Sequence, residues 1–253
     1  MSETKISRPS TTSPDPQIWP LGQQALLIRF GDGYVDHHQL AAAAASALNR
    51  AHIAGVTEIA AALTSVRINF DPALIQRRDL ADHVRDVLAK DDHSSHSAPR
   101  RLWTIPAVFG GEYGPQLDEA AQIAGLTADQ AVDQLAASTL SVLAIGFAPG
   151  QPYLGHLAQN WNMPRQTSLT PQVPQGALVV ALRQIVLFAN PSPTGWRWIG
   201  QVAFKPFDTN RKTPFAPRPD DMIRFEPTDR ETLDALRTSD DEGLGGATVK
   251  DVP

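Results

Sequence analysis

A turn rich in glycine and proline is the densest chemical feature of this sequence. Residues 146–155 read GFAPGQPYLG and follow directly after a run of apolar residues. Glycine allows main-chain N–H groups to approach a ligand closely, and proline restricts the loop, so little entropy is lost on binding. Tight corners of β-barrels use the same two residue types. The segment therefore predicts either a ligand-binding loop or a structural corner, and composition does not separate the two.

Two further connections place polar or aromatic side chains on proline-stiffened backbone. Arg165 follows Met163 and Pro164, and its planar guanidinium could bind a carboxylate through two parallel hydrogen bonds, although a loop arginine is more often solvated or structural. Trp196 ends the stretch NPSPTGW at 190–196, where its ring could line a pocket but more often fills a core. Asp208 and Glu112 are available as a general base, and because the spacing favours neither, the catalytic residue is unknown.

Several classes of site are excluded by missing motifs. The sequence contains no GxSxG, GxxxxGK[ST] or GxGxxG pattern, so nucleophile-elbow, phosphate-loop and dinucleotide sites are not expected. There are 0 cysteines, which excludes disulfides, cysteine-based zinc sites and thiol nucleophiles. His93 and His96 lie in a polar run that reads as a linker, so we expect no metal site.

The composition indicates a globular protein. The 253 residues are 42% hydrophobic and 19% charged, with a formal net charge of -5. This excludes global disorder and gives no electrostatic reason to expect nucleic acid. No apolar run approaches the roughly 20 residues of a membrane span, and residues 1–16 lack the apolar stretch of a signal peptide. We expect a cytoplasmic protein that contacts neither membrane nor nucleic acid.

The first half of the chain has the pattern of a small α+β domain. Apolar runs bounded by turn residues predict strands at 25–30, 56–62 and 65–70. Helical spacing of apolar residues predicts helices at 36–53 and 78–90. The order strand, helix, strand, strand, helix indicates a sandwich with both helices on one face of the sheet.

The second half changes character after a polar linker. A strand is expected at 102–108, a helix at 115–124, and a second helix opened by the capping box that Thr127 and Gln130 form. Short apolar runs between proline-rich and glycine-rich connections then predict a closed or sandwiched β structure. The expected domain limits are 1–17 (disordered arm), 18–90 (N-terminal α+β domain), 91–100 (linker), 101–227 (β domain) and 228–253 (flexible tail).

Seven motifs occur in an order that resembles the carboxyltransferase C/D-type family. This family includes allophanate hydrolase subunit 1, the B-type subunit of bacterial 5-oxoprolinase and the sporulation kinase inhibitor Kip. The resemblance covers about 18–226 and implies that the β domain is a cyclophilin-like β-barrel. It is carried by WPLGQQALLIRFG, SVRINFDP, GGEYGP, IGFAPGQPYLG, PR, VPQGALVVA and SPTGWRWIGQ.

The resemblance also implies a set of substrate-binding residues. Three pieces of the family pattern carry them: the GFxPGxxYL loop, the PR and VPxG pieces, and the stretch that ends in SPGGWxxIG. The candidates are Gly146, Phe147, Pro149, Gly150, Tyr153, Arg165, Gln184, Ser192, Gly195 and Trp196. Main-chain donors near Gly146 and Gly150 are expected to stabilise developing negative charge.

The chain departs from the family pattern at several positions, as a divergent member would. Gln151 stands where phenylalanine is usual, Gln172 replaces a second arginine, and Leu182-Arg183 replaces a Gly-Gly pair. Losing the arginine removes an anchor for a carboxylate or phosphate. Arg183 is a conceivable substitute for that charge from a nearby loop.

The function that the resemblance implies is that of a subunit, inactive alone, of an ATP-dependent amide-hydrolysing complex. The implied enzyme is 5-oxoprolinase, which opens 5-oxoproline to glutamate. The implied partners are an allophanate hydrolase subunit 2-like protein and a third subunit. The resemblance implies that ATP binds either to this chain or to a partner subunit. The alternative is a non-catalytic regulator similar to the histidine-kinase inhibitor branch. Prolyl isomerase activity is a weak third option, because fold does not carry function.

Overall fold

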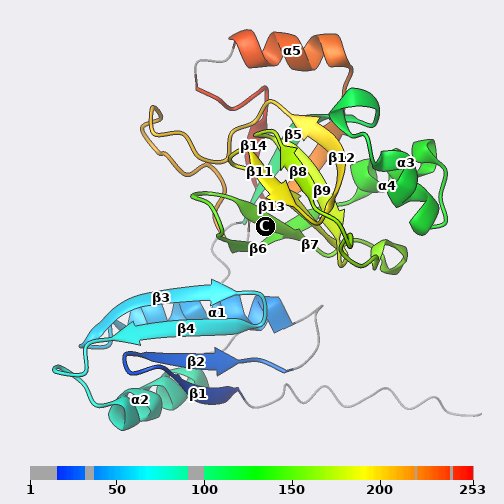
Figure 1. Ribbon diagram of the computed structural model, residues 1–253. Coiled ribbons are helices and arrows are strands. Elements are labelled where there is room, and N and C mark those ends of the chain that lie inside the picture. Colours follow the sequence, from blue (N-terminus) through cyan, green and yellow to red (C-terminus); the bar gives the residue numbers. More distant parts are fainter. Residues whose placement is uncertain (1–15, 32–36, 91–99, 220, 240–241, 253) are drawn as a thin grey trace, which may run out of the picture. The chain divides into compact units, whose positions relative to one another are not determined.

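The chain forms two compact units, residues 1–91 and 92–253. The computed structural model describes residues 16–31, 37–90, 100–219, 221–239 and 242–252 (Figure 1). Residues 1–15 of the arm expected at 1–17, and nearly all of the linker expected at 91–100 with His93 and His96, lie outside the described residues, whereas Gln17 already belongs to a strand. No helix in these ranges is both long and apolar enough to cross a lipid bilayer.

The N-terminal unit is an antiparallel sheet covered by two helices. The strand order is β1-β2-β4-β3. Apolar side chains from one face of the sheet and from both helices form a single core, because alternate strand residues and every third or fourth helix residue point the same way. Both helices therefore lie on one face, as predicted. The elements are β1 (Gln17–Leu21), β2 (Ala25–Arg29), α1 (His37–Ala51), β3 (Val56–Ala62), β4 (Ser65–Phe70) and α2 (Arg77–Lys90).

The C-terminal unit is built on a closed seven-stranded β-barrel, in agreement with the predicted fold class. The strands follow the order β12-β9-β10-β7-β6-β13-β5, and pairing of β12 with β5 closes the circle. β13 and β5 are parallel, and the other pairs around the barrel are antiparallel. The strands are β5 (Arg100–Phe109), β6 (Leu140–Ile145), β7 (Pro152–Gly155), β9 (Ala177–Ala181), β10 (Gln184–Leu187), β12 (Arg197–Val202) and β13 (Met222–Pro227).

Helices and a two-stranded ribbon complete the C-terminal unit. α3 (Leu117–Ile123) and α4 (Ala128–Ala137) pack their apolar sides into the barrel core. The predicted capping box is present at α4, where Thr127 accepts from the Gln130 N–H and Gln130 accepts from the Thr127 N–H. The ribbon pairs β8 (Thr170–Val173) with β11 (Ser192–Thr194).

The end of the chain differs from the expected flexible tail at 228–253. α5 (Arg230–Ser239) carries the fully buried Leu233, and β14 (Thr248–Val252) pairs antiparallel with β5. The sheet edge of β5 offers unpaired main-chain groups that β14 satisfies. This segment is therefore part of the C-terminal unit (Figure 1).

Candidate functional site

Strand β9 is buried on both faces, and its outer face forms the floor of the candidate site. Leu178 and Val180 point into the barrel core, whereas Ala177, Val179 and Ala181 belong to a second apolar cluster outside it. This two-sided burial explains why β9 reads as an unbroken apolar run.

The outer cluster brings three of the predicted residues onto one face. Tyr153 pairs with Val186, and Gln184 lies two residues from Val186 on the same strand, so its side chain takes the same face. The ring of Trp196 meets the Tyr153 ring edge-on, with 6.3 Å between centroids. We call Tyr153, Val179, Val186, Trp196 and Trp198 the aromatic platform.

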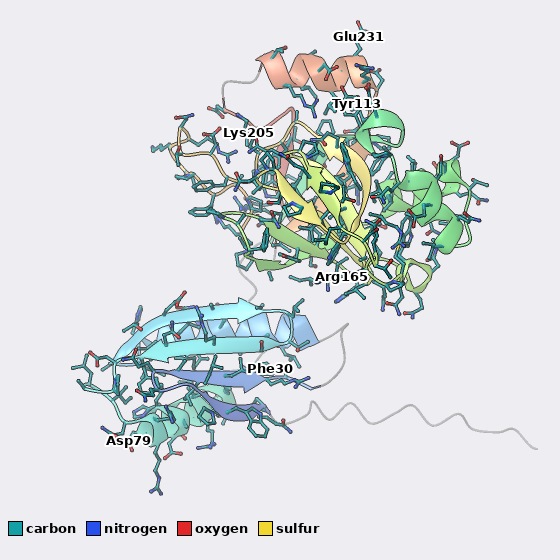
Figure 2. All side chains as sticks on the ribbon, in the orientation of Figure 1. Phe30, Asp79, Tyr113, Arg165, Lys205 and Glu231 are labelled. Carbon is teal, nitrogen blue, oxygen red and sulfur yellow. The ribbon has the colours of Figure 1, made fainter. Side chains whose placement is uncertain are left out.

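Arg165 lies over this platform. Its guanidinium carbon is 5.5 Å from the centroid of the Trp196 ring, and the side chain is exposed at the periphery of the C-terminal unit (Figure 2). A guanidinium over an aromatic ring is attracted to the ring face and can still donate its N–H groups to an anion. Among the described residues these N–H groups have no hydrogen-bond acceptor. Gly195 lies next to Arg165, because a Cβ on Gly195 would be 4.0 Å from the Arg165 Cβ.

Two glutamines that the sequence did not single out fix the Arg165 loop in place. The Gln166 N–H donates to the Gly195 carbonyl at 2.7 Å, and its side-chain amide donates to the Trp196 carbonyl at 2.9 Å. Gln116, at the start of α3, donates to the Gln166 side-chain oxygen at 2.7 Å and accepts from the Trp198 N–H at 2.9 Å. The loop is thus tied both to the start of β12 and to the start of α3.

An ion pair missed by sequence reasoning lies beside the platform. Arg197 is 8% exposed; its Nε donates to Glu119 at 2.8 Å and its Nη1 to the Pro164 carbonyl at 2.9 Å. Because Pro164 precedes Arg165, this pair also holds the arginine loop. The sequence offered one signal for Arg197 as a site residue, which is that it directly follows Trp196.

The Gly-Pro turn at 146–150 is held by contacts of its own. Gly150 has φ +71°, and a Cβ there would lie 2.7 Å from the Phe207 Cβ, so glycine is needed for both conformation and space. Phe147 is 77% exposed with φ 71°, and Pro149 is also exposed. The Gly146 N–H donates to the Gln151 carbonyl at 3.0 Å. That donor is therefore already used within the turn, which corrects its expected role toward developing charge.

Ser192 lies at the margin of the platform. It pairs with Val173 across the β8–β11 ribbon, and the Val173 side chain packs in the same cluster as Trp196. The structure thus gathers Tyr153, Arg165, Gln184, Gly195 and Trp196 in one region and places Ser192 next to it.

The structure shows the surroundings of three residues that depart from the family pattern, Gln151, Leu182 and Arg183. Leu182 and Arg183 occupy the two-residue turn between β9 and β10 with φ 52° and 62°, a conformation that glycine adopts without strain. The Arg183 Nε donates to the Leu157 carbonyl at 2.9 Å, which ties this side chain to the segment that follows β7. Gln151 is 1% exposed and accepts from the Ala189 N–H at 3.3 Å.

Neither carboxylate named as a general base is suited to that role. The Asn210 N–H donates to Asp208 and, with the nearby Lys205 ammonium, lowers the pKa of that carboxyl below its usual value of 3.8. A lowered pKa makes a carboxylate a weaker base. Glu112 is exposed and paired with Arg230.

Comparisons with known proteins agree with this architecture. The family model described as "Carboxyltransferase domain, subdomain C and D" matches residues 16–217. A Bacillus subtilis (strain 168) protein, named as the B-type subunit of 5-oxoprolinase, is 29% identical over 224 residues, which cover 83% of this chain and 91% of the relative.

Solved structures are similar to most of the chain. The crystal structure of TTHA0988 superposes with a TM-score of 0.70 and 28% identity over 81% of this chain, which spans 40% of that protein. The K. lactis urea amidolyase superposes with a TM-score of 0.79 over 96% of this chain and 16% of its own length. At 16% identity, the second likeness shows the fold alone.

Proposed function

This chain belongs to the carboxyltransferase domain, subdomain C and D family, and we propose that it is the B-type subunit of an ATP-dependent 5-oxoprolinase complex. The proposed reaction opens the cyclic amide of 5-oxoproline to give glutamate. The Bacillus subtilis relative, which carries the name of that subunit and aligns over most of both chains, supports this assignment. In the proposed complex the chain acts with an allophanate hydrolase subunit 2-like protein and a third subunit.

One observation carries the chemical part of the proposal, namely the exposed Arg165 guanidinium that lies over the Trp196 ring. In the proposal the edge of this guanidinium binds the substrate carboxylate through two charge-assisted hydrogen bonds. Trp196, which lies under the guanidinium, is itself 7% exposed, so in the proposal the contact with substrate is made by Arg165. Gln166 and Arg197 keep the loop in position, so little freedom is lost when the anion binds.

The residues at the platform do not fit ATP as a second ligand. A triphosphate with its magnesium ion needs several cationic or main-chain donors and carboxylate ligands. Of the two arginines beside Trp196, Arg197 is committed to Glu119 and the Pro164 carbonyl. The proposal therefore assigns ATP binding and the general base to partner subunits, and no step on this chain passes through the nucleotide.

The experiment that tests this assignment compares two arginine variants in the reconstituted complex. Arg165→Ala removes the proposed carboxylate anchor, and Arg224→Ala removes an exposed arginine of β13 that contacts Thr139. A charge-assisted pair contributes about 1.5–3 kcal/mol, so Arg165→Ala should lower kcat/KM for 5-oxoproline by about 10- to 100-fold. Arg224→Ala should leave kcat/KM within about twofold of the wild type.

Equal kcat/KM values for Arg165→Ala and the wild type would remove Arg165 from the substrate site. Size-exclusion chromatography of both complexes checks that assembly is unchanged. A loss of activity through failed assembly is thereby separated from a loss of substrate binding.

A further inference from the structure

Residues 134–204 carry very little charge. This stretch contains no lysine, aspartate or glutamate, and its charged residues are Arg165, Arg183 and Arg197, whereas 19% of the whole chain is charged. Of the three arginines, Arg165 is exposed, Arg183 is half-buried and Arg197 is buried. The surface that this stretch presents to solvent therefore has Arg165 as its main charge.

Burial of strands explains only part of this depletion, because it extends to exposed positions. Residues 158–174 cover most of the chain between β7 and β9 and are mostly exposed. They contain Arg165 as their one charged residue. Loss of lysine, aspartate and glutamate with arginine retained is the composition of the centre of protein–protein interfaces.

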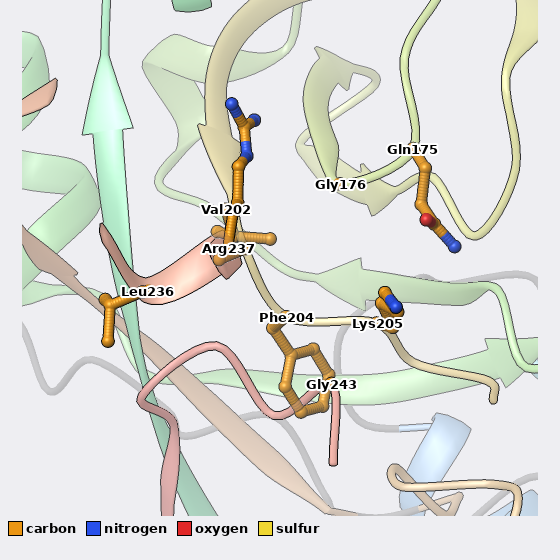
Figure 3. A pocket seen from close by; sticks show the side chains of 9 residues that line it. Gln175, Gly176, Val202, Phe204, Lys205, Leu236, Arg237 and Gly243 are labelled. Carbon is orange, nitrogen blue, oxygen red and sulfur yellow. The ribbon is translucent and has the colours of Figure 1, made fainter. Parts of the chain in front are cut away.

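The charge pattern changes directly after residue 204. Lys205 and Arg237 line a separate pocket of the C-terminal unit, and each forms an ion pair with an aspartate, Asp208 or Asp234 (Figure 3). Interspersed charges of both signs are usual on a surface that faces water. The contrast sets the region around Arg165 apart from the rest of the C-terminal unit.

Two exposed leucines flank Arg165. Leu169 is 67% exposed, and its Cδ2 is 3.6 Å from the position of a Cβ on Gly195, the glycine next to Arg165. Leu182 is 45% exposed, and its N–H donates at 2.8 Å to the carbonyl of Met163, two residues before Arg165. The two leucines thus adjoin the Arg165 loop from different segments. Exposed apolar residues that gather in this way mark contact sites more often than single ones do.

Leu182 also breaks a backbone preference. Its φ is 52°, in the left-handed region where glycine, asparagine and aspartate are favoured over branched apolar residues. The same residue thus has an unfavourable backbone conformation and an apolar side chain in water. Departures from local preference gather at functional sites, where another contact compensates for them.

The proposed function supplies the occupant of this surface, and the inference rests on it. In that proposal Arg165 holds the substrate carboxylate, and the general base belongs to a partner subunit. A base must come within about 3 Å of the proton that it removes. A partner that reaches substrate at Arg165 must therefore also approach the residues beside it.

We propose that Arg165, Leu169 and Leu182 form the docking surface for the subunit 2-like partner. The partner covers both leucines with an apolar surface of its own and presents the general base next to Arg165. Excluding water from this surface strengthens the hydrogen bonds between the guanidinium and the substrate.

The first experiment measures the dissociation constant of the full chain and the subunit 2-like protein without substrate. Leu169→Asp and Leu182→Asp each place a charge in the proposed contact and should raise this constant at least about 30-fold. Aspartate suits the positive φ of residue 182, so the second variant should fold normally. The matched control is Leu74→Asp in the N-terminal unit, where Leu74 is 73% exposed, and it should leave the constant unchanged. Thermal unfolding checks that each variant is folded.

A second measurement does not disturb the contact by adding charge. The chain has 0 cysteines, so Leu169→Cys introduces a single thiol. Saturating partner should slow the reaction of this thiol with a maleimide, followed by mass spectrometry of this chain. The thiol of Leu74→Cys should react at the same rate with and without the partner.

The outcomes separate this inference from the proposed function. Wild-type affinity of both folded leucine variants, or labelling of Leu169→Cys that the partner does not slow, would overturn the docking surface alone. A leucine-dependent complex that shows no ATP hydrolysis with 5-oxoproline would refute the proposed function and leave the docking surface in place. Failure of the wild-type chain to bind the subunit 2-like protein would overturn both.

Discussion

Replacing Asp221 with asparagine should destabilise the C-terminal unit strongly. Asp221 is 4% exposed and lies just before β13. Its carboxylate accepts from the Arg101 Nε, the Trp103 indole N–H and the Arg218 N–H, each at 2.9 Å, and from a second Arg101 nitrogen. The carboxylate thus ties β5 to the chain entering β13 at the point where the two strands begin to pair.

The magnitude follows from the burial of this ion pair. Asp221→Asn keeps the shape but removes the charge and turns an N–H₂ group toward donors. Removing one partner of a fully buried pair costs about 3–5 kcal/mol. The Arg101 side chain is 18% exposed, which lets water reach it. We therefore expect a loss of about 2–4 kcal/mol, or roughly 5–15 °C in Tm for a unit of this size.

Thermal unfolding followed by tryptophan fluorescence measures this loss. Trp103, Trp161, Trp196 and Trp198 report on the C-terminal unit, where they are situated. The matched control is Glu112→Gln, which breaks the exposed pair with Arg230 and should cost less than about 1 kcal/mol. A Tm for Asp221→Asn equal to that of the control would refute the reasoning.

Further predictions concern the glycine turn and one carboxyl group. Gly150→Ala should lower stability by about 1–3 kcal/mol, because its φ is +71° and the new Cβ meets Phe207, whereas Gly146→Ala has open space and should cost less than about 1 kcal/mol. Urea unfolding of the two variants tests this, and equal midpoints would contradict it. The pKa of Asp208 is lowered by the Asn210 N–H, so its stabilising contribution is present above pH 3.8 and is lost as pH falls through the lower folded value. A carboxyl NMR titration should give a midpoint below 3.8, and a midpoint at or above 3.8 would contradict the assignment.

Local signals were sufficient for the elements with strong patterns. The capping box at Thr127 and the unbroken apolar run of β9 each predict their element from neighbouring residues, and both are present. The edge strands β1 and β14 lack such a pattern, since nearly all of their residues are exposed. Their pairing is decided by the strands they join, β2 and β5, so it could not be predicted locally.

The candidate site was predictable in its motif residues and not in their supports. Arg165 and Trp196 were singled out from their proline-rich connections and again from the family motifs, and the structure places one over the other. The link that holds them runs from Gln116 to Gln166, residues 50 positions apart. Such a contact depends on the closed barrel and leaves no local trace in the sequence. For the same reason the contact of the Arg183 Nε with the Leu157 carbonyl could not be predicted from the sequence.

The most direct test of the central proposal is ATP hydrolysis that depends on 5-oxoproline. The chain is mixed with its subunit 2-like partner and the third subunit, and the rate is measured with and without this chain. The account predicts that 5-oxoproline stimulates ATP hydrolysis and that the stimulation disappears when this chain is omitted. An equal stimulated rate in its absence, or no stimulation from a complex that assembles normally, would contradict the assignment of this chain as a 5-oxoprolinase subunit.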